Sequence, residues 1–171
     1  MTLRMAEQRY GMSAEELRPH FALREVEFKP LNVSNRSVRA TFIAADEALL
    51  RWTPAWELAH LAGTAQLRTQ LGARVEDWVP EPGMKANRPD AIWQPGEQVV
   101  AVEFDAGYPP KIVREKLRTF ADFDQVVWGT PSPVRASHLR SRYASSQREF
   151  VVTDITASVA AQVRSAALGA G

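Results

Sequence analysis

The sequence predicts an α+β protein with a three-layer α/β arrangement, in which helices flank a mixed β-sheet. Two observations support this prediction. Apolar runs with strand-like spacing alternate along the chain with longer stretches of helical spacing, and turn residues separate the two kinds of segment. The composition is also ordinary for a globular protein, with 45% hydrophobic and 24% charged residues. A chain of 171 residues suits one main domain with a small appendage.

Composition also excludes several classes of protein and site. The chain has no cysteine, so disulfides, thiolate metal sites and a cysteine nucleophile are excluded. The first residues lack the apolar stretch of a signal peptide, and no apolar run approaches the roughly 18 residues that a membrane span needs. We therefore expect a cytoplasmic protein with no membrane segment. The net charge of +1 does not by itself indicate nucleic acid binding.

Residues 1–45 predict two short helices followed by a hairpin. A first helix is expected over residues 3–10, and a capping box over residues 13–16 begins a second one. Alternating residues over 24–29 and 38–43 predict two strands joined by a polar turn. The pattern leaves two interpretations open. The segment is either a partial winged helix built on a helix-turn-helix, or an extension that packs on the main core or serves as a dimerisation arm.

The longest helical pattern runs over residues 46–71 and is interrupted at Thr53 and Pro54. Thr53 is expected to cap a helix whose first residue is Pro54. His60 lies on this helix, and a hydrogen-bonded histidine at the helix surface is favoured over a polar group near a site. The apolar face of the helix has roughly helical spacing and contains Trp56, Leu58, Leu61, Ala62, Ala65, Leu67 and Leu71.

Three strands are expected after this helix, over residues 73–80, 89–93 and 98–105. A turn-rich loop separates the first two, and a short turn containing proline and glycine separates the last two. We therefore expect the three strands to form an antiparallel sheet.

The remaining chain predicts a return to the same sheet. Pro109 and Pro110 suit the start of a helix, whose core-facing stripe includes Lys116. A buried strand over residues 125–129 should run parallel to its neighbour, because a helix connects the two. After this strand we expect a helix over residues 134–143, a strand over residues 149–153 and an alanine-rich helix from Asp154 onward. We place the main domain at residues 46–160 and a frayed tail at 161–171.

Three carboxylates lie on the second and third of these central strands. Asp90 follows Pro89 at the start of one strand, and Glu103 and Asp105 are two residues apart near the end of the next. Residues two apart on a strand face the same side, so the three acids can converge at one sheet edge. Mg²⁺ takes oxygen ligands from one or two carboxylates together with phosphate and water. The pattern therefore predicts a site for Mg²⁺ or Mn²⁺, while any one acid alone is more often a solvated strand end.

The order of these residues resembles known motifs. Pro89-Asp90, a hairpin and Glu103-Phe104-Asp105 resemble the core motif of the PD-(D/E)xK nucleases, which have the restriction-endonuclease-like fold. Over roughly residues 40 to 143, the chain is also similar to the replication-relaxation family of plasmid-borne proteins. This second likeness depends on His60-Leu61, Trp78, Arg88-Pro-Asp-Ala, Val102-Glu-Phe-Asp-Ala-Gly, Lys116-Leu117 and Trp128-Gly-Thr-Pro-Ser-Pro.

The resemblance implies a function and a set of partners. It implies a Mg-dependent deoxyribonuclease that nicks DNA during plasmid replication, DNA relaxation or processing. DNA is the expected partner, and a homodimer and replication proteins are further candidates. The resemblance also implies that Asp90 and Glu103, together with Asp105, hold the metal. Glu57 is the candidate for a further ligand or water-positioning group, because many nucleases of this fold place a glutamate on the first core helix.

Asp105 stands where the nuclease family has lysine. Lys116, the one charged residue on the core-facing stripe of its helix, is the candidate to turn toward Glu103 and supply the missing ammonium group, and the alternative is a side chain that extends to solvent with its stem packed. Either Lys116 or Lys111 would stabilise the charge that develops on the phosphate. The alternative is a catalytically inactive nuclease-fold protein that binds DNA or a replication partner, because Asp105 adds negative charge where a phosphate would approach. A protein that acts through protein contacts would use Trp52, Trp56, Tyr108 or Tyr143 as interface anchors.

Basic residues near the acids and on the hairpin are candidates for contacts with DNA phosphates. The full set is Arg36, Arg39, Lys85, Arg88, Lys111, Arg114 and Arg135. In the winged-helix interpretation, Arg36 and Arg39 lie on the wing.

Overall fold

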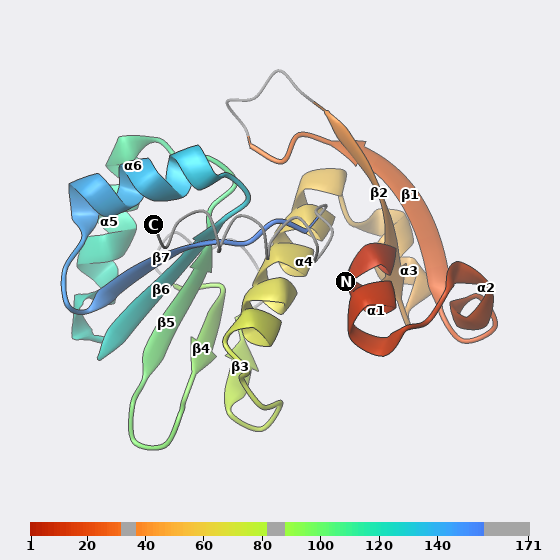
Figure 1. Cartoon of the computed structure of the whole chain (residues 1–171), viewed down its shortest axis with the longest axis horizontal. Coiled ribbons are helices and arrows are strands. Elements are labelled where there is room, and N and C mark those ends of the chain that lie inside the picture. The colour runs from red at the N-terminus through yellow and green to blue at the C-terminus, as the bar shows by residue number, and fades with distance from the viewer. Residues whose placement is uncertain (32–36, 82–87, 156–171) are drawn as a thin grey trace, which may run out of the picture.

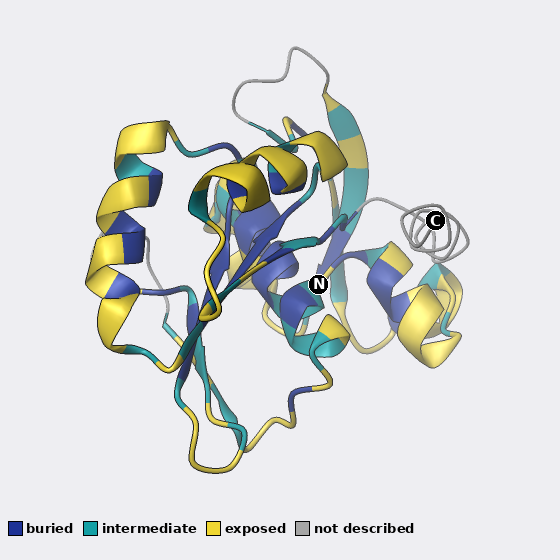
Figure 2. Cartoon of the chain, turned by 60° about the vertical axis from the view of Figure 1, so that its left-hand side comes forward, coloured by how far each residue is buried: buried dark blue, intermediate teal, exposed yellow. Residues whose placement is uncertain are grey.

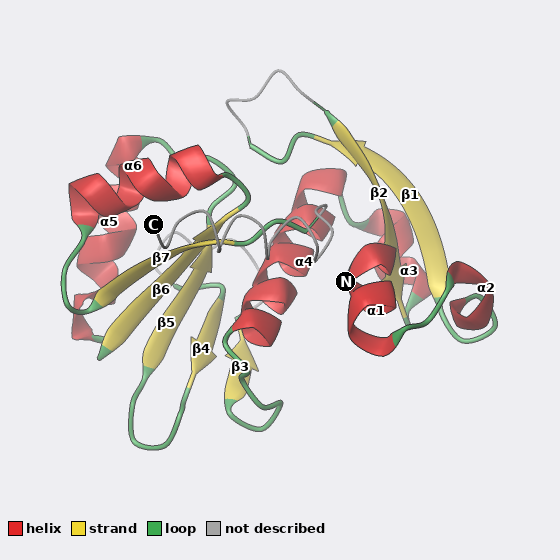
Figure 3. Cartoon of the chain, in the orientation of Figure 1, coloured by secondary structure: helices red, strands yellow, loops and turns green. Residues whose placement is uncertain are grey.

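The computed structural model describes residues 1–31, 37–81 and 88–155. Two predicted phosphate contacts, Arg36 and Lys85, lie outside the described residues, as does the predicted tail. The alanine-rich helix predicted from Asp154 lies outside them from residue 156 onward, and Asp154 and Ile155 are not helical. Figure 1 and Figure 3 show a mixed α+β molecule in which α4 lies between a large sheet and a smaller hairpin. The elements are α1 (Leu3–Tyr10), α2 (Ala14–Leu17), β1 (Ala22–Phe28), β2 (Val38–Ala44), α3 (Glu47–Trp52), α4 (Ala55–Gln70), β3 (Trp78–Pro80), β4 (Ala91–Trp93), β5 (Val100–Phe104), α5 (Pro110–Thr119), a 3₁₀ turn (Phe120–Asp122), β6 (Gln125–Thr130), α6 (Pro133–Tyr143) and β7 (Arg148–Val152).

The two short helices and the hairpin form as predicted. The Ser13 hydroxyl accepts a hydrogen bond from the Glu16 backbone and thereby completes the capping box that begins α2. β1 and β2 pair antiparallel, with Ala22 opposite Ala44 and Phe28 opposite Val38. We call α1, α2, β1 and β2 the hairpin unit. It shares one hydrophobic core with α3 and α4, made of Met5, Phe28, Phe42, Leu50, Leu58, Ala59, Ala62 and Ile155.

The long helical stretch is divided at Pro54, but not in the way the sequence predicted. Thr53 ends α3 in an extended conformation (ψ 129°), Pro54 takes the cap position, and α4 begins only at Ala55. The expected Thr53 cap was therefore wrong. Proline disfavours the helical conformation of the residue before it, which ends α3 at Thr53. Pro54 itself is extended, with ψ 151°, so the cap of α4 moves one residue along, from Thr53 to Pro54.

The large sheet has the strand order β3-β4-β5-β6-β7. β3, β4 and β5 are antiparallel, and β6 runs parallel to β5, as predicted. β7 runs parallel to β6. β3 is shorter than expected, because residues 73–77 form a turn in which Arg74 Nε donates to Asp77 Oδ2 at 2.7 Å.

The two faces of the large sheet pack against different helices, which gives the three-layer arrangement in Figure 1. One face meets α4 through Val102, Phe104 and Leu67. The other face meets α5 and α6 and is built from Ala101, Val113, Leu117, Phe120, Val126, Trp128, Leu139 and Phe150. Figure 2 shows these strands buried between helices whose outer sides are exposed. In the part of the chain that the structure describes, no helix is both long and apolar enough to cross a membrane.

Gly63 allows α4 to approach the sheet closely. A Cβ atom built at this position would lie 2.4 Å from atoms of the Phe104 ring, well inside van der Waals contact. A residue larger than glycine would therefore separate α4 from β5. This close approach also brings His60, one turn earlier on the same helix face, to the end of β4 and β5.

Candidate active site

Asp90 and Glu103 come together where β4 pairs with β5. Ala91 lies opposite Val102, so the residue before β4 is adjacent to the end of β5. The Asp90 backbone N–H donates to the Val102 carbonyl at 3.0 Å, and Asp90 Oδ2 accepts from the Phe104 N–H at 2.7 Å. Backbone pairing thus holds the Asp90 carboxylate along β5. The predicted convergence of these two acids is confirmed.

Lys116 of α5 reaches the same place. Its Nζ atom lies 2.8 Å from Glu103 Oε1 and donates to the Arg88 carbonyl at 3.3 Å. The rings of Tyr108 and Phe120 flank the ammonium group, each centroid lying 5.5 Å from Nζ. Glu103 has no solvent exposure, and Lys116 is only 5% exposed. The expected position of Lys116 beside Glu103 is therefore confirmed.

The charge of Glu103 is incompletely balanced in this site. Burial raises the pKa of the Glu103 carboxyl well above its ordinary value, and the neighbouring Asp90 raises it further. Lys116 and the Tyr108 hydroxyl act in the opposite direction. Lys116 Nζ lies 2.8 Å from Glu103 Oε1, yet burial and Asp90 outweigh these two neighbours. The carboxyl group therefore favours an added proton or cation.

His60 is buried at this site, so its expected place at the helix surface was wrong. The side chain is 7% exposed, and Nε2 lies 2.8 Å from Asp90 Oδ1. The ring meets Phe104 edge-on, with centroids 5.7 Å apart. The sequence does contain a signal for this position. His60 precedes Gly63 by three residues and so shares the helix face that touches the sheet.

Asp105, a predicted metal ligand, lies on the same face of the sheet as Glu103 but is engaged by other partners. Glu103 lies opposite Trp128 across β5 and β6, and the Trp128 indole reaches Asp105. Asp105 instead accepts hydrogen bonds from the backbone N–H of Tyr108 at 2.6 Å and from Trp128 Nε1 at 3.1 Å. It also pairs with Arg135 Nη2 at 2.7 Å. The side chain is fully buried and holds the loop that follows β5.

Arg135 also holds the loop that follows β5. In addition to Asp105, its Nη2 atom donates to the Tyr108 carbonyl at 2.6 Å. Arg135, which the sequence predicted as a phosphate contact, therefore binds groups of the protein itself, and its side chain is only 22% exposed. Sequence reasoning assigned Tyr108 only to an interface, yet Asp105 and Arg135 hold Tyr108 beside Lys116.

The other predicted phosphate contacts lie on the surface. Arg39 is near Glu25 and Glu27 on the hairpin, at 3.7 Å and 3.9 Å. Arg88 pairs with Glu81 at 2.9 Å. Lys111 and Arg114 are exposed on α5, the helix that also bears Lys116.

Two pockets flank His60. The first, which we call the Asp90 pocket, has a volume of about 250 Å³ and is lined by Asp90, His60, Glu57 and Arg68, among others. Glu57, the predicted water-positioning group, therefore lies in the same pocket as Asp90. The second, which we call the Tyr108 pocket, has a volume of about 130 Å³ and also contains His60.

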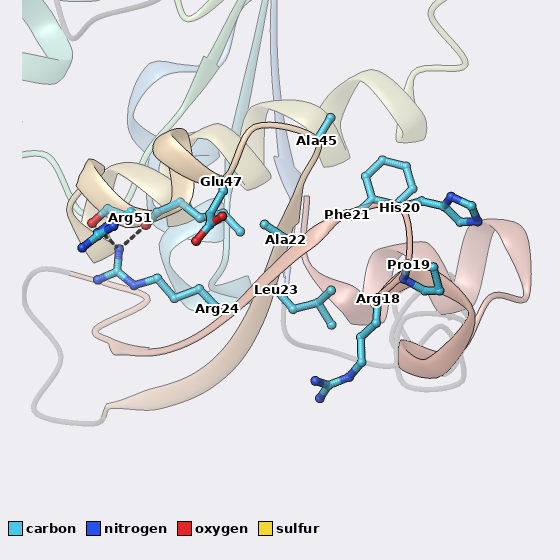
Figure 4. A pocket seen from close by; sticks show the side chains of 11 residues that line it. Arg18, Pro19, His20, Phe21, Ala22, Leu23, Arg24, Ala45, Glu47 and Arg51 are labelled. Atoms are coloured by element: carbon cyan, nitrogen blue, oxygen red, sulfur yellow. Dashed lines mark hydrogen bonds between the residues drawn. The ribbon is translucent and has the colours of Figure 1, made fainter.

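A wider groove of about 840 Å³ lies away from these acids, on the hairpin unit beside α3. Figure 4 shows that its basic side chains diverge, with Arg18, His20 and Arg51 pointing in different directions. Arg24 is occupied, because its guanidinium donates to the carbonyls of Leu50 and Thr53 at the end of α3. The groove has no convergent set of polar groups.

The donor set at the acid pair suits a hard divalent cation. Among the described residues, no group of three His, Asp or Glu side chains is arranged to hold a metal ion. Asp90 and Glu103 alone provide two carboxylates, and Mg²⁺ commonly binds one or two carboxylates while keeping water and phosphate as further ligands. A bound cation would share these carboxylates with Lys116, which lies 2.8 Å from Glu103 Oε1, and with the Phe104 N–H, which donates to Asp90 Oδ2.

Neither a scan against protein-family models nor a search of curated proteins finds a match to this chain.

Proposed function

We propose that the chain is a DNA-binding protein with a PD-(D/E)xK-like, metal-dependent phosphodiesterase site that nicks DNA. One observation supports this most strongly. The acid pair Asp90 and Glu103 lies beside an ammonium group, because Lys116 Nζ is 2.8 Å from Glu103 Oε1. Two carboxylates and one cation at the end of paired strands are the parts that such hydrolysis requires.

The order of elements also supports the proposal. A helix, three antiparallel strands, a second helix and a parallel strand follow one another as α4, β3, β4, β5, α5 and β6. This is the order that the resemblance to the restriction-endonuclease-like fold implies. The Lys116 ammonium substitutes for the motif lysine from a different element, α5, since Asp105 is committed to the loop after β5.

Each residue of the site has a defined role in this proposal. Asp90 and Glu103 hold Mg²⁺ or Mn²⁺, which when bound lowers the pKa of a coordinated water and offsets phosphate charge. Lys116 supplies a fixed positive charge beside the carboxylates, where it stabilises the charge that develops on the phosphate. His60 orients the Asp90 carboxylate through its 2.8 Å contact. Glu57 lines the same pocket and positions water there.

The contact with DNA is proposed to involve α5. Lys111, Arg114 and Arg118 are exposed on this helix, which also directs Lys116 inward. Exposed cations that neutralise phosphates give an affinity that falls steeply with salt concentration. The same helix would thereby connect phosphate binding at the surface with the acid pair beneath it.

A second candidate is a nuclease-fold protein that binds DNA without cleaving it. The full burial of Glu103 favours this alternative, because its pairing with Lys116 also serves as a buried ion pair with no catalytic role. Asp105 further removes the motif lysine from its usual position. The two candidates differ in whether a divalent cation produces cleavage.

The deciding experiment is incubation of purified protein with supercoiled plasmid in Mg²⁺, Mn²⁺ or EDTA. We expect metal-dependent conversion to open circles, which Glu103→Gln and Asp90→Asn abolish while gel shifts remain nearly unchanged. Glu115→Gln on the exposed side of α5 is the matched control and should nick like the wild type. Plasmid that stays intact with either metal but still shifts in the gel would identify the DNA-binding alternative.

A further inference from the structure

The Tyr108 pocket adjoins the acid pair without containing it. His60 lines this pocket and also lies 2.8 Å from Asp90. Tyr108 lines it as well, and the Tyr108 ring lies 5.5 Å from Lys116 Nζ. Both of these side chains therefore separate the pocket from the residues proposed to act on a phosphodiester. A group bound in the pocket would be next to the bond that is cut.

The walls of the pocket are aromatic and apolar. Phe28, Phe104 and Ala106 line its interior, and Trp56 contributes an indole that is 53% exposed. A large exposed aromatic ring beside an apolar pocket offers a surface on which a planar ring can stack. Bases of single-stranded nucleic acids bind to proteins in this way, with little dependence on sequence. The pocket is small, with a volume of about 130 Å³, so we take one base as its occupant.

The charges around the two pockets differ. The Asp90 pocket is lined by three acids, Glu57, Glu81 and Asp90, against one arginine, Arg68. Among the described residues that line the Tyr108 pocket there is no carboxylate, and the exposed Lys29 lies at its edge. A nucleotide bears a negative phosphate, so the Tyr108 pocket is the one whose charge suits it.

We propose that the Tyr108 pocket binds one unpaired nucleobase next to the acid pair, with Trp56 stacking on the base and Lys29 contacting its phosphate. The substrate class is therefore single-stranded or frayed DNA, in preference to an intact duplex. This inference rests on the proposed function for the choice of DNA as ligand, and it adds the strand state of the substrate.

The test measures binding in EDTA, so that cleavage does not contribute. A fluorescein-labelled oligothymidylate and a duplex of the same length are titrated with protein, and fluorescence anisotropy is recorded. We expect tighter binding of the single strand, and Trp56→Ala should weaken that binding by about 5- to 150-fold, the range that loss of one stacked base gives. Trp56→Phe retains an aromatic face and should restore most of the affinity.

Trp52 provides the matched control. It is a more exposed tryptophan, 76% exposed, on α3 and outside the described lining of the pocket, so Trp52→Ala should leave single-strand binding unchanged. Equal binding of both DNA forms, or equal losses from Trp52→Ala and Trp56→Ala, would overturn the pocket assignment. If either of these binding results is found while Trp56→Ala still nicks plasmid, only the proposed role of the Tyr108 pocket is refuted. Single-strand binding that depends on Trp56 without any nicking would refute only the nuclease.

Discussion

A carboxyl group with no solvent exposure, such as that of Glu103, is stable only when another group balances its charge. Lys116 provides part of this balance at 2.8 Å, while Asp90 opposes it. Proton binding and cation binding are the two ways to complete it. The same imbalance explains why Glu103 is both costly for folding and suited to a metal.

The pH dependence of stability tests this view of Glu103. Because the folded state raises the pKa of this carboxyl above 4.5, the folded protein retains a proton that the unfolded chain has already released. The contribution of Glu103 to the free energy of unfolding should therefore decrease as pH rises from about 4.5 to the raised pKa. Urea denaturation in EDTA across this range should show the decrease in the wild type, and Glu103→Gln should flatten it. Identical pH profiles would contradict the raised pKa.

Variants of Arg135 and Lys111 compare a structural cation with one that is proposed to contact DNA. Arg135 pairs with the buried Asp105, so Arg135→Ala should lower the free energy of unfolding by about 3 kcal/mol and leave the salt dependence of DNA binding unchanged. Lys111 is exposed, so Lys111→Ala should leave the free energy of unfolding unchanged. It should reduce the slope of the logarithm of the DNA-binding constant against the logarithm of salt concentration by about 1. Urea denaturation and DNA titrations at several salt concentrations measure both effects, and a reduced slope in Arg135→Ala would restore its role as a phosphate contact.

Among the elements, hydrophobic spacing and turn residues predicted the order and directions of the described strands well. Errors occurred at element ends, where the partners of a side chain come from distant parts of the chain. Asp105, just after β5, is bound by the Tyr108 backbone and by Arg135. Thr53 precedes a proline and therefore ends α3. These ends depend on tertiary hydrogen bonds to residues distant in sequence, such as the Arg135 contact to Asp105.

The close packing of α4 on β5 gives a prediction for Gly63. Gly63→Ala introduces a Cβ at 2.4 Å from the Phe104 ring and should lower the free energy of unfolding by about 1–3 kcal/mol. The double variant Gly63→Ala/Phe104→Leu should be less destabilised than the sum of the two single variants, because a smaller side chain removes the clash. Urea denaturation of the four proteins measures the coupling. Strict additivity would show that the two residues do not limit the approach of the helix.

In the whole molecule, α4 joins the two parts that the sequence treated separately. One side of this helix packs in the core shared with the hairpin unit, and another side brings His60 to Asp90. The sequence indicated Asp90, Glu103 and Lys116 as a site, since strand pairing and helix spacing place them. It favoured a surface position for His60 and gave Tyr108 only as an interface anchor, because the places of both depend on how α4 and the loop after β5 pack in three dimensions.

The binding of Mn²⁺ to the purified protein, followed by electron paramagnetic resonance, most directly tests whether the acid pair is a metal site. In the proposed site, Asp90 and Glu103 are the two carboxylate ligands, so the wild type should bind Mn²⁺ saturably, and added Mg²⁺ should compete with it. Glu103→Gln should abolish this binding, and Glu115→Gln should retain it. Saturable Mn²⁺ binding that Glu103→Gln leaves intact, or no binding by the wild type with or without single-stranded DNA, would contradict the proposed metal site.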